Sequence, residues 1–371
     1  MHIGVPREIK NNEYRVGLAP DSVRELVAAG HRVLVEQGAG RTIDYTDEHY
    51  EAAGASIAPT AQAVYEAADL IVKVKEPQPN EIRMLRPEQV LFTYFHLAAD
   101  AAQTEQLLAS GAICIAYETV TDDRGRLPLL APMSEVAGRM SVQAGAHHLE
   151  KAQGGRGILL GGVPGVAPGR VVILGGGVVG SNAATVAVGL GAQVTIFDRS
   201  VDRLRELEQR FGGTVTTLYA TTGAIEQAVS SADLVVGAVL VPGAAAPKLV
   251  TRDMVRGMKP GAVVVDVAID QGGCFETSRP TTHQEPTFVV DDVVHYCVAN
   301  MPGGVPRTAT QALNNVTLPY VLKLAESPVG ALFRDANLRN GLNIHTGRVT
   351  HKAVAESLGY PFVDPFEALK K

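Results

Sequence analysis

The chain has 371 residues, enough for roughly two or three domains of about 150 residues each, with large buried cores. Its 46% hydrophobic and 19% charged residues are typical of a folded globular protein and exclude a disordered chain. A net charge of −6, without any basic block, excludes a general nucleic-acid-binding surface. No apolar run is long and unbroken enough for a signal peptide or a membrane-spanning helix, so we expect no membrane partner.

The three cysteines give no sign of a disulfide framework. Cys114, Cys274 and Cys297 are far apart, odd in number and without C-x-x-C spacing. We therefore expect a reduced, cytoplasmic setting.

Short apolar runs alternate with longer amphipathic runs through the first third of the chain. A helix is expected over residues 21–29, where Gly30 fits a left-handed helix cap. Strands that alternate with helices predict a parallel sheet covered by helices on both faces. The expected strands are "HIGVP", "RVLVE", "DLIVKVK", "VLFTYFH" and "AICIAYE".

The segment "TDDRGRLPLL" breaks this alternation and is a candidate hinge. A long helix over residues 134–152 and a Gly/Pro-rich loop then lead into a second series of strands and helices. The helices after "YCVANMPGGVPR" cannot form a core alone, so we expect them to pack on the first domain.

The predicted fold class is therefore α/β, with two Rossmann-like parallel-sheet domains separated by a cleft. The substrate domain is expected to be discontinuous, formed by residues 1–129 and 307–371. The dinucleotide-binding domain is expected at residues 130–306.

A dinucleotide-binding motif lies in "RVVILGGGVVGSNAA", where Gly175, Gly177 and Gly180 form a G-x-G-x-x-G pattern. An apolar strand precedes it, a helical run follows it, and Asp198 ends the next strand near the spacing expected for a ribose-binding carboxylate. The glycines let the backbone approach a pyrophosphate at a helix N-terminus. Because the Asp198 carboxylate repels a 2′-phosphate, we expect NAD in preference to NADP, a preference that neighbouring Arg199 weakens slightly.

Two lysines interrupt the apolar run "DLIVKVKEPQ". A strand period of two places Lys73 and Lys75 on one face, at the carboxyl end where ligands of α/β sheets gather. Lysines are rarely buried without a partner. For Lys73 we favour a salt bridge or a side chain that reaches solvent, whereas Lys75 fits equally well a structural role or contact with a small anionic substrate.

Other candidates follow strands on the same edge. His96 ends "VLFTYFH" and is either structural or a proton carrier, since histidine exchanges protons near neutral pH. Arg15 lies on the loop after the first strand and is either a surface residue or a carboxylate-binding one. Asp270 is expected to close the strand "GAVVVDVAID", in which Asp266 has a structural role.

Other chemistries find no support. His147 and Glu150 have helical spacing but lack further ligands, so we expect a solvated helix face and no metal site. Cys274 has no nearby base, and there is no G-x-S-x-G nucleophile motif.

Taken together, these motifs resemble the family shared by alanine dehydrogenase and the NAD-binding subunit of proton-translocating transhydrogenase, over essentially the whole chain. The resemblance implies reversible, NAD-dependent oxidative deamination of L-alanine to pyruvate and ammonia, with hydride transfer at an iminium carbon, by a homohexamer. The segments that carry it are "GVPREIKNNEYRVGLAP", "IVKVKEP", "YFHLA", "MSEVAGRMSVQAGAHHLEK", "GGVPGV", "GGGVVG", "KPGAVVVDVAIDQGGC" and "NMPGGVPRTAT".

Carried over residue by residue, the resemblance places the substrate carboxylate on Arg15 and Lys75 and acid–base chemistry on His96 and Asp270, without dividing the proton steps between them. It also implies that Tyr94, Met133 and Asn300 line the substrate pocket. For the cofactor it implies, besides the three glycines, Ser134, Val178, Val179, Asp198, Arg203, Val239, Leu240, Val267, Asp270, Arg279, Val298 and Met301. At position 220, where it implies a serine near the adenosine, this chain has Ala220.

Two alternatives stay open. A transhydrogenase-like subunit would bind NAD(H) and pass hydride to a membrane partner. A dehydrogenase for a larger amino acid would need a roomier pocket around Met133 and Met301.

Overall fold

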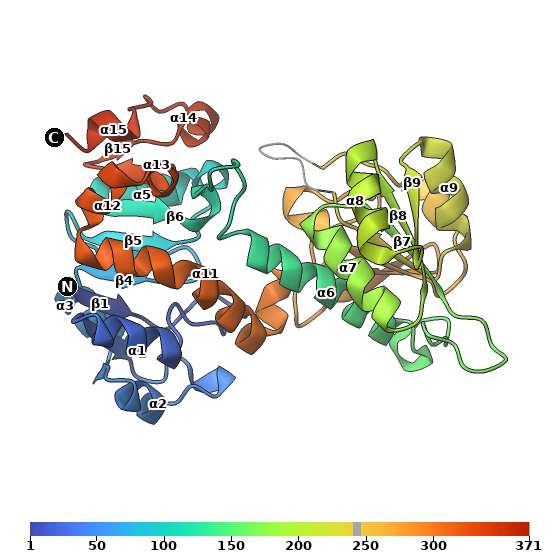
Figure 1. Cartoon of the computed structure of the whole chain (residues 1–371), viewed down its shortest axis with the longest axis horizontal. Coiled ribbons are helices and arrows are strands. Elements are labelled where there is room, and N and C mark those ends of the chain that lie inside the picture. Colours follow the sequence, from blue (N-terminus) through green and yellow to red (C-terminus); the bar gives the residue numbers. More distant parts are fainter. Residues whose placement is uncertain (240–245, 371) are drawn as a thin grey trace. The chain divides into compact units, whose positions relative to one another are not determined.

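The computed structural model describes residues 1–239 and 246–370 and divides into two units (Figure 1). Unit 1 comprises Met1–Met133 and Val305–Lys371, and unit 2 comprises Ser134–Gly304. Unit 1 is therefore discontinuous in sequence, as predicted.

Unit 1 is built on an eight-stranded sheet with the order β15-β14-β6-β5-β4-β1-β2-β3. Strands β1 to β6 are parallel, whereas β14 and β15 extend the sheet in antiparallel pairs. The sheet consists of β1 (His2–Val5), β2 (Arg32–Glu36), β3 (Ser56–Ala58), β4 (Leu70–Val72), β5 (Val90–Thr93), β6 (Ile113–Ala116), β14 (Leu342–His345) and β15 (Arg348–Val349).

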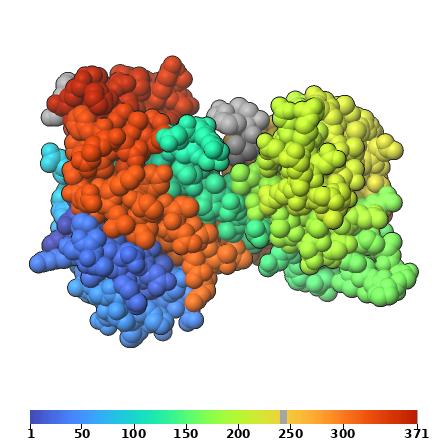
Figure 2. Space-filling view, viewed as in Figure 1, coloured from blue at the N-terminus to red at the C-terminus, as the bar shows by residue number. Residues whose placement is uncertain are grey.

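Helices cover this sheet, and they come from both ends of the chain. Ile71 and Leu91 pack from one face against Val64 of α3 and Leu107 of α5. Helix α11 lies beside α1, and in the space-filling view the C-terminal residues of unit 1 lie directly against its N-terminal residues (Figures 1 and 2). The helices are α1 (Pro20–Ala28), α2 (Asp47–Ala52), α3 (Ala61–Ala67), α4 (Pro79–Ile82), α5 (Ala101–Ser110), α11 (Pro306–Glu326), α12 (Pro328–Arg334), α13 (Ala336–Arg339), α14 (Lys352–Leu358) and α15 (Pro365–Ala368).

Unit 2 has a seven-stranded sheet with the order β12-β13-β11-β10-β7-β8-β9. All neighbours are parallel except β12, which pairs antiparallel with β13 at the edge. The strands are β7 (Arg170–Leu174), β8 (Gln193–Asp198), β9 (Val215–Tyr219), β10 (Leu234–Gly237), β11 (Val263–Asp266), β12 (Thr287–Val290) and β13 (Val293–Tyr296).

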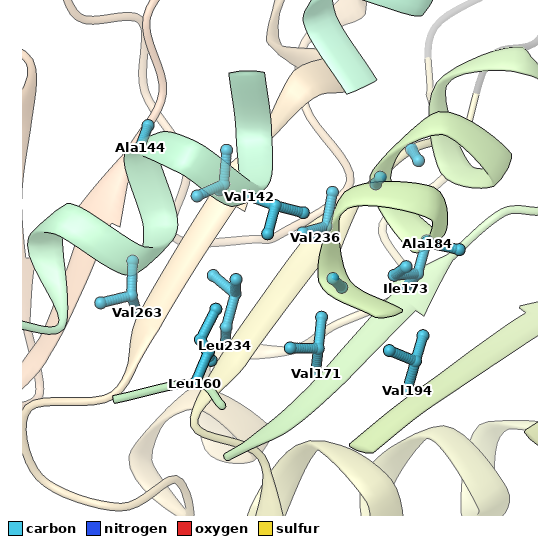
Figure 3. Close-up of a cluster of buried hydrophobic side chains, with 14 of the residues drawn as sticks. Val142, Ala144, Leu160, Val171, Ile173, Ala184, Val194, Leu234, Val236 and Val263 are labelled. Carbon is cyan, nitrogen blue, oxygen red and sulfur yellow. The ribbon is translucent and has the colours of Figure 1, made fainter. Parts of the chain in front are cut away.

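The strands of unit 2 are apolar on both faces, as expected for a parallel sheet buried between helices. Val171 and Ile173 point into the cluster shared with α6 and α7 (Figure 3), whereas Val172 and Leu174 point into a second cluster on the opposite face. The helices of this unit are α6 (Ala131–His148, which begins in unit 1), α7 (Val178–Gly189), α8 (Val201–Phe211), α9 (Thr222–Ser231) and α10 (Arg252–Arg256).

Both sheets share the doubly wound strand order. In unit 1 the chain moves from β1 outward through β2 and β3, and then returns to the other side of β1 at β4. In unit 2 the corresponding strands are β7 and β10. Ligands of such sheets bind beyond the carboxyl ends of the strands at this switch point.

Gly180 in the first turn of α7 provides a test of the packing. A Cβ at Gly180 would lie 1.8 Å from the Gly175 carbonyl oxygen, whereas a Cβ at Gly189 in the same helix would meet nothing within 4 Å. Gly180→Ala should therefore lower the free energy of unfolding by about 1–3 kcal/mol, the usual cost of overpacking. Gly189→Ala should be neutral or slightly stabilising. Thermal unfolding of both variants checks this, and equal midpoints would contradict it.

Candidate active site

Four predicted site residues of unit 1 follow three adjacent strands, whereas Met133 lies on α6. Arg15 lies on the loop after β1, Lys75 on the segment after β4, and Tyr94 and His96 on the turn after β5. The switch point of the sheet lies between β1 and β4, and β5 is the next strand beyond β4. The topology therefore brings the segments that carry these residues to one edge.

Lys73 lies in a buried ion triad. Its fully buried ammonium is 3.1 Å from Oε2 of Glu8 and 2.7 Å from Oε1 of Glu81. Burial alone lowers the pKa of Lys73, but the two carboxylates raise it to about 12. The predicted salt bridge at Lys73 is confirmed. The strand itself ends at Val72, so the expectation that both lysines belong to the strand was wrong.

Glu8 also fixes the backbone that carries Lys75. Its Oε1 accepts hydrogen bonds from the amides of Val74 at 2.7 Å and Lys75 at 3.4 Å. The Lys75 carbonyl accepts a hydrogen bond from Oγ1 of Thr93 at 3.0 Å. Burial raises the pKa of the Glu8 carboxyl to about 7, although Lys73 opposes the rise. The half-buried Lys75 is thus held between the loop after β1 and strand β5.

Arg15 is buried, which removes the alternative of a surface arginine. Its Nε and Nη2 donate to the two carboxylate oxygens of Glu13 at 2.7 and 2.6 Å, and its Nη1 lies 3.1 Å from Sδ of Met133. Burial lowers the pKa of Arg15, but the Glu13 carboxylate raises it above its ordinary value. The guanidinium is therefore a buried, fully charged group with a fixed orientation.

Tyr94 and His96 form the turn after β5. The Tyr94 hydroxyl donates to the Leu129 carbonyl at 2.5 Å, and the Tyr94 and His96 rings are nearly parallel, with centroids 6.0 Å apart. His96 is exposed and has a left-handed backbone with φ of 54°. The Glu118 carboxylate accepts the His96 amide at 2.6 Å. A non-glycine residue in this conformation is uncommon and often marks a functional site.

The glycine-rich turn of unit 2 has the geometry of an anion cradle. Gly175 has φ of +101°, and Gly180 must lack a side chain because of its contact with the Gly175 carbonyl. Gly177 is the N-cap of α7, so no capping side chain binds the first amides of the helix. A Cβ at Gly177 would meet nothing within 4 Å. The chain thus keeps open space beside the amides of a helix N-terminus, which suits a pyrophosphate.

Asp198 and Arg203 hold the same turn. Asp198 Oδ2 accepts the Gly176 amide and its Oδ1 accepts the Ser200 amide, each at 2.8 Å. Arg203 Nε donates to the Gly176 carbonyl at 2.7 Å. The acidic residue predicted for the ribose therefore lies at the end of β8, in contact with the turn predicted for the pyrophosphate.

Asp270 lies on a separate turn of unit 2. Strand β11 ends at Asp266, and exposed Asp270 lies in the following 3-10 helix (Val267–Gln271), so the expectation that it closes the strand was wrong. The buried Asp266 accepts the amides of Ala268 at 3.1 Å and Cys274 at 2.9 Å, as its predicted structural role requires. Lys248 Nζ binds the other end of the turn through three carbonyls, those of Gly272, Gly273 and Phe275, at 2.6, 2.9 and 3.1 Å.

The remaining predicted residues lie mostly at strand ends of unit 2, and Leu240 lies outside the described residues. Arg279 places its guanidinium 4.2 Å from the centre of the Phe288 ring, and Asn300 has a left-handed φ of 59°. The amide of Ala220 donates to the Asp198 carbonyl at 3.0 Å. Ser134 lies on α6, Val178 and Val179 on α7, Val239 after β10, Val267 after β11, and Val298, Asn300 and Met301 after β13.

Sequence reasoning missed the acidic residues that hold these groups. Glu8, Glu13, Glu81 and Glu118 contact Lys73, Arg15 or the backbone of the predicted site. The partners of Glu8 and Glu118 lie on other segments of the chain, which a sequence pattern does not show. The one local signal was Glu13, two positions before Arg15.

His147 and Glu150 form an exposed pair at 3.4 Å, as expected of a solvated helix face. In the described part of the chain, no three His, Cys, Asp or Glu side chains gather closely enough to hold a metal ion.

Comparison with known proteins gives the family. The family model described as "Alanine dehydrogenase/PNT, N-terminal domain" matches residues 4–137, and the model of the C-terminal domain matches residues 141–352. The chain belongs to the alanine dehydrogenase/PNT family. Alanine dehydrogenase of Halomonas elongata is 60% identical to it over 98% of both chains.

Two solved structures show the same fold. One, titled L-alanine dehydrogenase, is 57% identical, with a TM-score of 0.95 over 97% of this chain and 99% of the other. The other, a transhydrogenase from Sinorhizobium meliloti, is 26% identical, with a TM-score of 0.83 over 95% and 100%. The predicted α/β class with two parallel-sheet domains is confirmed.

In this alanine dehydrogenase/PNT family member, the buried triad predicts a large effect of Lys73→Met. The variant leaves the Glu8 and Glu81 carboxylates buried without their counter-charge, so it should lose about 3–5 kcal/mol of stability at neutral pH. Part of the loss should disappear as the pH falls from neutral towards 4.5, the ordinary pKa of Glu, because Lys73 lowers the pKa of Glu8 in the wild-type protein. Without Lys73 the folded variant takes up a proton at Glu8 at a higher pH than the wild type does, which removes one of the uncompensated charges.

Lys10→Met is the matched control, because Lys10 is 40% exposed in its ion pair with Glu76. Removing it should change stability by at most about 1 kcal/mol. Urea unfolding over this pH range measures both variants. Equal losses would show that the triad does not stabilise the fold.

Proposed function

We propose that this protein is an NAD-dependent L-alanine dehydrogenase, which converts L-alanine reversibly to pyruvate and ammonia. The observation that supports this proposal most directly is the placement of Arg15, Lys75 and His96 after three adjacent strands, β1, β4 and β5, of unit 1. Two cations beside a proton-exchanging group suit a small keto acid. The full-length similarity to alanine dehydrogenases supports the same reaction.

Arg15 and Lys75 hold the substrate carboxylate in this proposal. Glu13 binds Arg15 at Nε and Nη2, and Sδ of Met133 lies 3.1 Å from its Nη1. Lys75 also polarises the keto oxygen, and its backbone is fixed by Glu8 and Thr93. Tyr94, Met133 and Asn300 line the substrate pocket.

The residues of unit 2 fit a dinucleotide. Gly175, Gly177 and Gly180 and the first turn of α7 hold the pyrophosphate, and Asp198 accepts the ribose hydroxyls. Ser134, Val178, Val179, Arg203, Ala220, Val239, Leu240, Val267, Asp270, Arg279, Val298 and Met301 complete the proposed contacts. The bound cofactor supplies hydride in the reductive direction and accepts it in the oxidative direction.

His96 and Asp270 move the protons. When ammonia adds to the keto carbon and water leaves, the carbonyl oxygen must gain protons and the nitrogen must lose one. Both side chains are exposed on turns that other residues hold in place, His96 in unit 1 and Asp270 in unit 2. Imidazole and carboxylate groups can carry these protons at neutral pH.

The weaker alternative is a transhydrogenase-like subunit, because the similarity to the transhydrogenase is 26% against 57% for the L-alanine dehydrogenase structure. Among the described helices, none combines the length and apolar character needed to span a bilayer. We place the enzyme in the cytoplasm as a homohexamer. Light scattering at assay concentration should give six times the 39.1 kDa chain mass, and a monomer mass would contradict the hexamer.

The deciding experiment follows NADH absorbance with purified protein, pyruvate and ammonium, and with glyoxylate and 2-oxobutyrate in parallel. Decay that needs both ammonium and a keto acid is expected, fastest with pyruvate. Lys75→Met and His96→Ala should each lower kcat by at least about 100-fold, the scale of a lost general acid or base. Their affinity for NADH, measured by fluorescence, should stay within about twofold because the cofactor residues lie in unit 2.

Lys10→Met and His147→Ala are the matched controls, since both change exposed side chains of the same types. Both controls should keep wild-type turnover. If NADH binds but no keto acid consumes it, the binding-subunit alternative replaces this proposal. If Lys75→Met or His96→Ala keeps near-normal kcat, the role given to that residue is wrong.

A further inference from the structure

Glu118 binds the backbone of the turn that carries His96. Its Oε1 accepts the His96 amide at 2.6 Å and the Phe95 amide at 3.1 Å, whereas Oε2 accepts only the Phe95 amide, at 3.3 Å. Glu118 itself lies in the 3-10 helix Tyr117–Thr119 that follows β6, the neighbour of β5. A single carboxylate oxygen therefore makes the two shortest contacts with the turn.

The conformation of His96 explains why those contacts matter. The residue has φ of 54° and ψ of 39°, which is a left-handed backbone conformation. A non-glycine residue keeps this conformation only where contacts with its surroundings offset the energetic cost. This backbone sets the direction in which the imidazole leaves the turn, nearly parallel to the Tyr94 ring. An acceptor at the two amides stabilises this conformation, because the amides converge on it only when the turn is bent in this way.

The rest of the turn is fixed by other groups. The Tyr94 amide donates to the Val74 carbonyl at 3.2 Å, and the Phe95 carbonyl accepts Nε2 of Gln103 at 2.9 Å. The Leu97 carbonyl accepts Oγ1 of Thr104 at 3.2 Å. Glu118 thus supplies the acceptor at the strained residue, His96. Other groups bind the residues before and after it.

Hydrogen bonds also fix the backbone segment that carries Glu118. The Ala116 amide donates to the Gly341 carbonyl at 2.7 Å, and Nδ2 of Asn343 donates to Oγ1 of Thr119 at 2.7 Å. Both contacts tie the segment around Glu118 to β14 and the residue before it. The carboxylate therefore has a fixed place from which to hold the His96 turn.

We propose that Glu118 is a positioning residue for the reaction, which acts through His96 by holding its backbone in the left-handed conformation. This inference rests on the proposed function for its kinetic consequence. The contact itself does not depend on that function. A small displacement of a catalytic group can cost about 100-fold in rate.

The test compares Glu118→Met with Glu118→Gln. Methionine has a similar length but offers no oxygen, whereas glutamine keeps one oxygen that can take the place of Oε1 and accept both amides. Glu118→Met should lower kcat about 100-fold, with pyruvate KM and NADH affinity changed by no more than about twofold. Glu118→Gln should stay within about threefold of wild-type kcat. Glu105→Met, an exposed change on α5, is the control and should match wild type.

Crystal structures of the two Glu118 variants provide a readout that needs no turnover. His96 should leave the left-handed region in Glu118→Met and keep it in Glu118→Gln. If His96 keeps its backbone and ring position in Glu118→Met, the positioning role is overturned. It is equally overturned if Glu118→Gln loses as much kcat as Glu118→Met.

Two further outcomes are separable. If none of the keto acids leads the wild-type protein to consume NADH, the proposed function fails. The crystal structures alone then decide the role of Glu118. If Glu118→Met is not recovered folded, Glu118→Asp replaces it, because its carboxylate is one methylene short of the amides. A lowered kcat with unchanged NADH affinity in that variant supports the inference, and wild-type kcat overturns it.

Discussion

Backbone amides that leave a parallel sheet at the carboxyl ends of its strands need new acceptors, and the rest of this structure depends on how they find them. Carboxylates provide these acceptors at several loops of the described chain, including four that carry proposed site residues. Glu8 binds the segment after β4, Glu118 the turn after β5, Asp198 the turn after β7, and Asp266 the loop after β11. In the first three cases the carboxylate lies on or after a different strand from the loop that it holds. The segments that carry Lys75, His96 and the glycine turn are therefore each shaped by an acid on or after another strand.

The buried ammonium of Lys73 makes one of these acceptors possible. Glu8 and Glu81 are both buried, and two neighbouring carboxylates without a cation would destabilise the fold or take up protons. Lys73 supplies the cation, so that Glu8 can accept the amides of Val74 and Lys75 with one oxygen and the ammonium with the other. The two lysines of "VKVK" thus have different partners. Lys73 stabilises the carboxylate that holds the backbone of Lys75, and in the proposed function Lys75 binds the substrate.

Features that depend on local pattern could be predicted from the sequence. The alternation of strands and helices predicted the parallel core of both sheets, but not β14 and β15, which lie where only helices were expected. The three glycines with Asp198 predicted a turn that the structure places against that carboxylate. Features that depend on distant residues could not be predicted. Arg15 gave no sign of burial because Met133 is far along the chain, and the apolar run of "GAVVVDVAID" concealed the point at which Asp266 ends the strand and a 3-10 helix begins. Glu118 left no sequence signal because its partners are backbone amides.

The two sheets share one strand order, yet the proposed function gives their switch points different ligands, and the loop after the central strand differs accordingly. In unit 2 a short glycine turn leads directly into α7 and leaves its first amides beside open space, which suits a phosphate. In unit 1 a longer loop, residues 6–19, follows β1. Two amides of this loop donate hydrogen bonds to side chains of α11. Thr310 accepts the Val16 amide at 3.3 Å, and Asn314 accepts the Ala19 amide at 2.8 Å. Because these amides are occupied, side-chain cations determine what unit 1 can bind. One arginine and one lysine in fixed positions suit the carboxylate of a small acid better than a nucleotide.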